Sequence, residues 1–213
     1  MSGSGKMVVT VRFSSATRGF ARIVTFMLGP DLPEVLRDAA QGDETAFARL
    51  WRDSQPPLLR YLRVLAGESA EDVASEVWLE ITRGLPRFRG GEPEFRSWLF
   101  TTARRRVIDL HRYTGRRPAI VTSDLRDLER SAPGDAATAA FERMSTDAAL
   151  DLIATLPREQ AEIIVLRVIA GLDVAQVARI VGKRPGTVRV TSHRALRALA
   201  ATLSAAADQE ATR

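Results

Sequence analysis

The sequence predicts an all-α protein in which two small helical domains are joined by a flexible linker. Hydrophobic residues recur at three- and four-residue spacing over most of the 213 residues. No segment shows the alternation of apolar and polar residues that is typical of a strand. Glycines, prolines and scattered charges interrupt the helical pattern at 113–140. We therefore expect domains at 31–112 and 141–204, a poorly ordered extension at 1–30 and a tail at 205–213.

Five helices are expected in the first domain, at about 32–40, from Asp43 onward, at 58–65, at 69–84 and at 94–112. Asp43 is a plausible N-cap for the second of these helices. Ser69 is expected to cap the fourth, and Asp72 at the third position would complete a capping box. That helix places apolar side chains on one side, and Gly84 and Pro86 end it.

The second domain is expected to contain helices at about 141–156 and 157–171, followed by a helix-turn-helix. Asp173 can cap the first helix of this motif, with Gln176 as the partner in a capping box. Gly182 supplies the turn, and Pro185 fits the first turn of the next helix. The two helices are expected to bury Val174, Val177, Ala178, Val181, Val188, Ala195, Leu196 and Leu199.

The opposite face of the second helix is basic and suits the major groove of duplex DNA. The residues that we expect to contact DNA there are Lys183, Arg184, Thr187, Arg189, Val190, His193, Arg194 and Arg197. Arginine to guanine is the commonest specific base contact, and lysine or arginine at the helix start suits phosphate. The alternative interpretation is a solvated basic face on an ordinary helical bundle.

The composition excludes several kinds of site. The chain has a formal net charge of +5, no cysteine and two histidines. Disulfides and thiolate–metal sites are therefore excluded, and a reducing compartment, the cytoplasm, fits. We expect no metal, no cofactor and no membrane insertion, because no apolar run reaches the roughly 20 residues that a bilayer span needs.

Aromatic and basic residues lie together in the predicted helix at 94–112. Rings beside arginines suit single-stranded DNA, because bases stack on the rings and arginines follow the backbone. The alternative for Phe95, Trp98 and Phe100 is packing in the core. Arg104, Arg105 and Arg106 are consecutive, so at least one of them must face solvent or DNA.

Three motifs in order resemble bacterial RNA polymerase sigma factors of the extracytoplasmic-function (ECF) group, in the sigma-70 family. Ala-Glu-Asp-Val-Ala-Ser-Glu-Val-Trp at 70–78 resembles the family's region 2.2, and 95–109 resembles regions 2.3 to 2.4. The segments at 156–167 and 171–182, with Gly-Thr-Val-Arg at 186–189, resemble region 4. The first domain would then be a region 2 bundle and the second a region 4 helix-turn-helix.

This resemblance implies roles for both domains in transcription initiation. Region 2 would dock on the clamp coiled coil of the largest subunit of core RNA polymerase through Asp72, Val73, Glu76, Val77 and Trp78. It would capture an unstacked base of the −10 element and help to melt the promoter through Phe88, Arg89, Trp98, Thr101, Thr102, Arg105 and Arg106. Region 4 would contact the polymerase flap and read the −35 element. The resemblance also implies an anti-sigma factor, around which the linker would let the two domains close.

The sequence departs from the family pattern at three places. Ser75 stands where glutamine is usual, and Arg105 stands where asparagine is frequent. Val-Thr-Ser at 190–192 replaces a more usual Ser-Arg-Leu, which puts Ser192 at a position that normally packs. The promoter sequence that the protein reads therefore cannot be carried over from its relatives.

Two other classes of function remain open at this point. A two-domain helix-turn-helix regulator could bind an operator without being a polymerase subunit, although the first half of the chain argues against a simple repressor. An enzyme is disfavoured because no carboxylate pair, no Ser/His/Asp set and no metal cluster has persuasive spacing.

Overall fold

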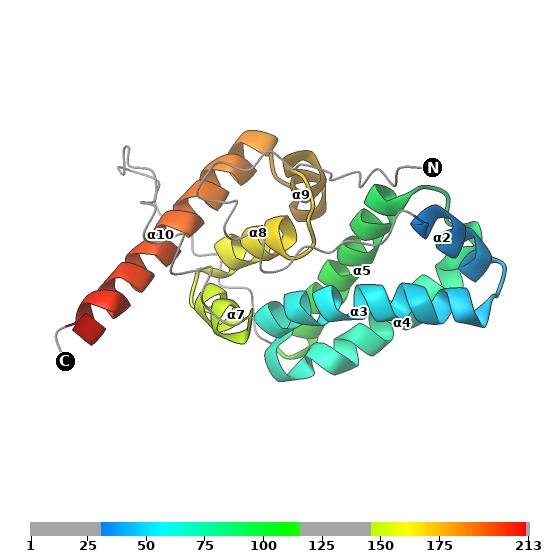
Figure 1. Ribbon diagram of the computed structural model, residues 1–213, viewed down its shortest axis with the longest axis horizontal. Helices are drawn as coiled ribbons and strands as arrows, with labels where there is room; N and C mark the ends of the chain where they lie inside the picture. The colour runs from blue at the N-terminus through cyan, green and yellow to red at the C-terminus, as the bar shows by residue number, and fades with distance from the viewer. Residues whose placement is uncertain (1–30, 116–145, 212–213) are drawn as a thin grey trace, which may run out of the picture.

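The computed structural model describes residues 31–115 and 146–211 of the chain, and both parts are helical (Figure 1). The first unit, residues 31–115, consists of α2 (Leu32–Ala40), α3 (Glu44–Ala66), α4 (Ala70–Gly84) and α5 (Glu92–Tyr113), with 3₁₀ turns at Gly67–Ser69 and Leu85–Arg87. The second unit, residues 146–211, consists of α7 (Thr146–Ala154), α8 (Arg158–Val168), α9 (Val174–Val181) and α10 (Pro185–Ala211). The described residues contain no strand, which confirms the all-α prediction.

Several sequence predictions fall outside the described residues. These are the extension at 1–30, most of the linker at 113–140, and the start of the helix expected at 141–156. Within the described part, none of the helices is both long enough and apolar enough to cross a membrane.

The prediction of separate helices after Asp43 and at 58–65 is wrong, because α3 is one helix of 23 residues. Pro56 and Pro57 both lie inside it. A proline in a helix interior costs on the order of 3 kcal/mol, since it removes a hydrogen bond and crowds the preceding turn. The helix persists because Leu50, before the prolines, and Leu58, after them, are both fully buried in the same core.

The helix ends show which local signals hold. The Asp43 carboxylate accepts a hydrogen bond from the Ala46 amide at 2.8 Å, which confirms it as the N-cap of α3. The capping box predicted at Ser69 is wrong. Ser69 has φ −80° and ψ 6° and makes no capping bond, because a 3₁₀ turn runs directly into α4 and withholds the extended backbone that a cap needs.

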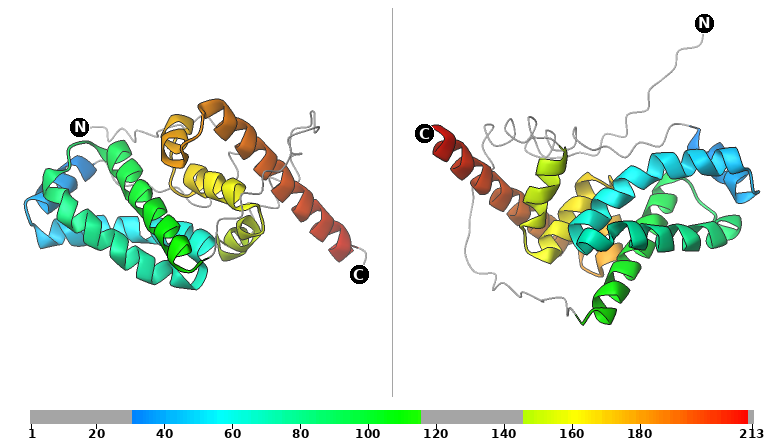
Figure 2. Two further views of the ribbon diagram at one scale, coloured as in Figure 1. Left: turned by 180° about the vertical axis from the view of Figure 1, so that it is seen from behind. Right: turned by 90° about the horizontal axis from the view of Figure 1, so that it is seen from below.

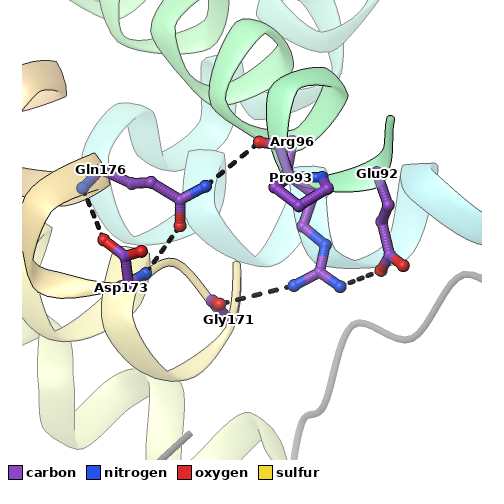
Figure 3. Close-up of polar contacts among 6 residues, drawn as sticks. All are labelled: Glu92, Pro93, Arg96, Gly171, Asp173 and Gln176. Carbon is purple, nitrogen blue, oxygen red and sulfur yellow. Dashed lines mark hydrogen bonds and ion pairs between the residues drawn. The ribbon is translucent and has the colours of Figure 1, made fainter. Parts of the chain in front are cut away.

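The helix-turn-helix forms as predicted. The Asp173 carboxylate accepts a hydrogen bond from the backbone N–H of Gln176, and the side-chain oxygen of Gln176 accepts one from the backbone N–H of Asp173, both at 2.8 Å (Figure 3). Gly182 then turns the chain with φ +70°, a conformation that glycine adopts without strain. Six of the eight predicted core positions are buried, namely Val177, Ala178, Val181, Val188, Ala195 and Leu199. Val174 and Leu196 are only partly buried and pack against this core.

The two units lie side by side and share one buried core. In Figures 1 and 2, α8 lies against α3, α9 lies beside the first half of α5, and α10 projects away from the bundle. The helices α3, α4 and α5 pack on one another in the first unit, with α2 against α3.

Candidate polymerase and DNA interfaces

The residues expected to dock on polymerase divide between the surface and the core. Asp72 and Glu76 are exposed on α4. Val73, Val77 and Trp78 are buried, with exposed fractions of 4%, 0% and 7%. The Trp78 indole N–H donates to the Gln55 side chain at 2.6 Å, and Phe47 packs edge-on against the ring. These three side chains therefore pack α4 against the core and are not available on its surface for a partner.

An exposed apolar residue, which the sequence analysis did not single out, accompanies the acidic pair. Leu79 has an exposed fraction of 57% and follows Asp72 and Glu76 at helical spacing. In the sequence, Leu79 could have been found as a single apolar residue at a position that the helical spacing assigns to the polar face of this helix. Ser75 is also exposed there, and its hydroxyl donates to the Glu71 carbonyl at 3.0 Å.

Two acids of α4 pair with two arginines of α5. Glu80 forms ion pairs with Arg105 and with Arg106, the latter at 3.0 Å, and Glu76 lies 3.8 Å from Arg106. The structure thus brings the predicted polymerase set and the predicted −10 set into contact through Glu76 and Arg106. The Arg106 Nε atom is buried and makes no hydrogen bond within the described residues.

An aromatic cluster lies at the start of α5. The rings of Phe88 and Trp98 stack with centroids 5.2 Å apart and planes 9° from parallel, and Phe95 meets both rings edge-on. Phe95 is fully buried, whereas Phe88 and Trp98 are half-buried. Gly84 makes room for the indole, because a Cβ atom there would lie 2.6 Å from Trp98 Cζ2.

The remaining predicted −10 residues lie on different sides of α5 and its preceding loop. Arg89 and Thr101 are exposed, and Arg105 has a side-chain exposure of 57%. The Arg89 guanidinium donates to the carbonyls of Pro86 and Phe88, at 3.1 and 2.7 Å. Thr102, by contrast, is only 3% exposed and belongs to the core.

The basic face of the helix-turn-helix is open to solvent. All eight predicted residues lie on the second helix or the turn before it, and Lys183, Arg184, Thr187, Arg189, Val190 and His193 are exposed while Arg194 and Arg197 are half-buried. Lys183 pairs with Glu159 of α8 at 3.2 Å. Opposite this face, Val188, Ala195 and Leu199 are buried, and the Ser192 hydroxyl is buried with no hydrogen bond in the described part of the chain.

Arg167 of α8 holds the segment that leads into the helix-turn-helix. Its guanidinium donates to the Leu172 carbonyl at 3.0 Å, just before α9 begins. Burial lowers the pKa of this guanidinium. Within residues 31–115 and 146–211, no group of His, Cys, Asp or Glu side chains could hold a metal ion.

Comparison with known proteins agrees with this geometry. The family models "Sigma-70 region 2" and "Sigma-70, region 4" match residues 47–117 and 146–199. The chain is 34% identical over 203 residues to the ECF RNA polymerase sigma factor SigD of Mycobacterium tuberculosis, covering 89% of this chain and 95% of that protein. It is 30% identical over 167 residues to SigL of the same species, covering 78% and 93%.

Among solved structures, the fold resembles CnrH, determined in complex with the cytosolic domain of CnrY. The TM-score is 0.55 at 23% identity, over 82% of this chain and 97% of the other. The segments that the two family models match include the α4–α5 pair and the helix-turn-helix described above. The chain therefore belongs to the ECF group of RNA polymerase sigma factors, within the sigma-70 family.

Proposed function

We propose that this sigma factor binds core RNA polymerase, directs it to promoters by reading −35 and −10 elements, and helps to melt the −10 region. It acts as a binding subunit and not as a catalyst, in the cytoplasm where the polymerase works. The observation that carries the proposal is the solvent-exposed basic face of α10, which follows a first helix, α9, that is capped at both ends.

The polymerase contact is proposed for the exposed face of α4. Asp72 and Glu76 supply negative charge, and Leu79 supplies an apolar contact between them and the end of the helix. This combination suits a partly basic docking surface, which we propose the clamp coiled coil of the largest subunit provides. Val73, Val77 and Trp78 contribute by holding this face in shape from the core. The second unit would contact the flap.

The −10 contact is proposed for the aromatic cluster and the adjoining surface of α5. Phe88 and Trp98 offer partly exposed ring surface for a base, and stacking is worth about 1–3 kcal/mol per base. Arg89, Thr101 and Arg105 reach solvent beside these rings and would follow the backbone. Thr102 supports the helix from inside, and Arg106 joins it to α4.

The −35 contact is proposed for α10, with Arg189 as the principal base reader. Lys183 and Arg184 at the helix start would contact phosphate, together with Thr187, and His193, Arg194 and Arg197 would extend the contact along the groove. Val190 is half-exposed and can offer only an apolar contact, for example to a thymine methyl group. Membership of the ECF group further supports control by an anti-sigma factor.

Transcription with core polymerase and a promoter library tests the proposal. Arg189→Ala should weaken −35 recognition, by about 1–3 kcal/mol for a lost base contact, and leave polymerase binding intact. The double variant Asp72→Ala, Leu79→Ala should weaken binding to core polymerase and leave −35 recognition intact. Arg179→Ala and Glu71→Ala, at exposed positions outside both surfaces, are the matched controls.

Three results would bear on the alternatives. Failure to bind core polymerase or to start any specific transcript would overturn the sigma factor function. Tight binding to a duplex operator without polymerase would favour the independent regulator. A loss of DNA affinity alone in both variants would overturn the division of labour between α4 and α10.

A further inference from the structure

An apolar side chain lies in the middle of the basic face of α10. Val190 is 50% exposed, more than any other large apolar side chain in the described part of the second unit. Single exposed apolar residues are common on protein surfaces, so exposure alone decides nothing. The position of Val190 on the helix and the side chains around it carry the argument instead.

Val190 lies close to the centre line of this face. Three side chains mark the opposite side of α10, which packs on the second unit, with exposed fractions of 0%, 0% and 1%: Val188, Ala195 and Leu199. At about 100° per residue, the direction opposite to these three passes within about 20° of Val190. Arg189 and Thr187 lie about 80° to either side of that direction. Val190 therefore points away from the protein, with Arg189 and Thr187 on its flanks.

The turn before Val190 carries no side chain on this line. Gly186 lies there, and nothing lies within 4 Å of the position that a Cβ atom on it would take. The backbone can therefore approach a ligand closely at Gly186. The N-terminal residues of a recognition helix are the ones that contact base edges, and Val190 is in the second turn of α10. Val190 is thus the first large side chain that the centre of the face offers to a groove.

Cations flank Val190 along the helix. The segment 183–197 contains no aspartate or glutamate, and its lysine and arginines are Lys183, Arg184, Arg189, Arg194 and Arg197. Glu159 of α8 meets only the first of these, Lys183, in an ion pair. A protein partner that covered Val190 would need an acidic rim around an apolar centre. The major groove of DNA has this arrangement, because its base edges lie between two phosphate chains.

One group in the major groove is complementary to valine. The side chain neither donates nor accepts a hydrogen bond, so it cannot pair with the polar groups of the base edges. The C5 methyl group of thymine is the apolar group that the four bases present there. A β-branched side chain in a helix has one strongly preferred rotamer, so Val190 loses little freedom on contact. Burying one methyl-sized group is worth about a fourfold change in affinity.

We propose that Val190 is a specificity-determining residue of the −35 contact, and that it selects a thymine through the C5 methyl group of that base. The proposal rests on the −35 function proposed above. Arg189 enters the same groove from the flank with a longer side chain. Successive helix residues rise about 1.5 Å and base pairs are about 3.4 Å apart, so the thymine should lie within about two base pairs of the position that Arg189 reads.

Selection of duplexes from a randomised library by the full chain, without polymerase, locates this base pair. The unchanged protein should enrich a thymine, and Val190→Ala should lose the preference at that base pair alone. Thr202→Ala is the matched control, because it also replaces an exposed β-branched residue of α10 by alanine. It lies about 18 Å further along the helix, and both changes favour the helix to a similar degree. A general effect on α10 would therefore appear in both variants.

Base analogues isolate the methyl group. Uracil differs from thymine only in lacking the C5 methyl group, so uracil at the selected position should weaken binding by the unchanged protein about fourfold in an anisotropy titration. It should not change the affinity of Val190→Ala. In the reverse arm, cytosine at this position should bind weakly, and 5-methylcytosine should recover about fourfold of the affinity. Thr202→Ala should follow the unchanged protein in both arms.

The outcomes separate this role from the function as a whole. No enriched thymine, or an enriched thymine whose uracil replacement binds equally well, would overturn the proposal. A Val190→Ala protein that keeps the thymine preference and loses affinity for core polymerase would also overturn it, because Val190 would then face the polymerase. Failure to start transcription with core polymerase would count against the proposed function alone, because the selection and the titrations contain no polymerase.

Discussion

Single atoms decide the shape of the proposed −10 surface, and Gly84 is the sharpest case. The Trp98 indole lies where a Cβ on this residue would be, at 2.6 Å. Gly84→Ala should therefore push the ring away or strain α4, and lower the free energy of unfolding by about 1–3 kcal/mol in a urea titration. Gly186→Ala is the control, because nothing lies within 4 Å of its Cβ position. Equal midpoints for the two variants would mean that the indole does not rest on Gly84.

Tyr61 offers a second test at the scale of one residue. Burial, and then the charge of Glu162, raise the pKa of its hydroxyl well above the ordinary value of 10.0. A pKa that is raised in the folded state contributes stability below the unfolded value and loses it as the pH rises above that value. The chain has two tyrosines, so Tyr113→Phe leaves Tyr61 alone. Tyrosinate absorbance should appear only as the protein unfolds in alkali, and half-ionisation near pH 10 with full helicity would contradict the buried contact.

Among the elements, the sequence predicted best where the signal is local. The capping box of α9 and the turn at Gly182 depend on residues three to nine positions apart, and both form as expected. At Ser69 the same signal failed, because the preceding turn sets the backbone angles. The continuity of α3 could not be seen either, since it depends on tertiary burial of Leu50 and Leu58 around two prolines.

The prolines of α3 make this argument testable. Pro56 is exposed and Pro57 is buried, although both interrupt the hydrogen bonds of the helix. Pro56→Ala should raise the free energy of unfolding by roughly 1–2 kcal/mol, because a backbone donor returns and no packing is lost. Pro57→Ala should gain less, because its buried ring leaves a cavity. A lower urea midpoint for Pro56→Ala than for the unchanged protein would contradict this prediction. It would mean that the proline ring stabilises α3 at this position.

At the scale of the whole molecule, folding redistributes the charge that the sequence displays in blocks. Acidic residues predominate from 34 to 80 and basic ones from 96 to 117, and the fold brings Glu80 onto two arginines of the basic block. The contact of Tyr61 with Glu162 spans 101 positions in the chain. No local pattern predicts such pairs. The sequence therefore predicts candidate DNA-binding residues on helices, but not which of them have acidic partners.

The partial neutralisation of α5 predicts how single-strand binding should depend on salt. Each phosphate contact contributes about 0.7 to the slope of log affinity against log salt for single-stranded DNA. Glu80→Gln releases Arg105 and Arg106 from their shared carboxylate, so this slope should steepen by roughly 0.7–1.4, with tighter binding at low salt. Glu44→Gln removes the same charge from the exposed start of α3 and is the control. Equal slopes for the two variants with single-stranded DNA would mean that the α5 arginines do not contact the strand. With duplex DNA the slope should be the same for both variants, because the duplex contacts the separate cations of α10.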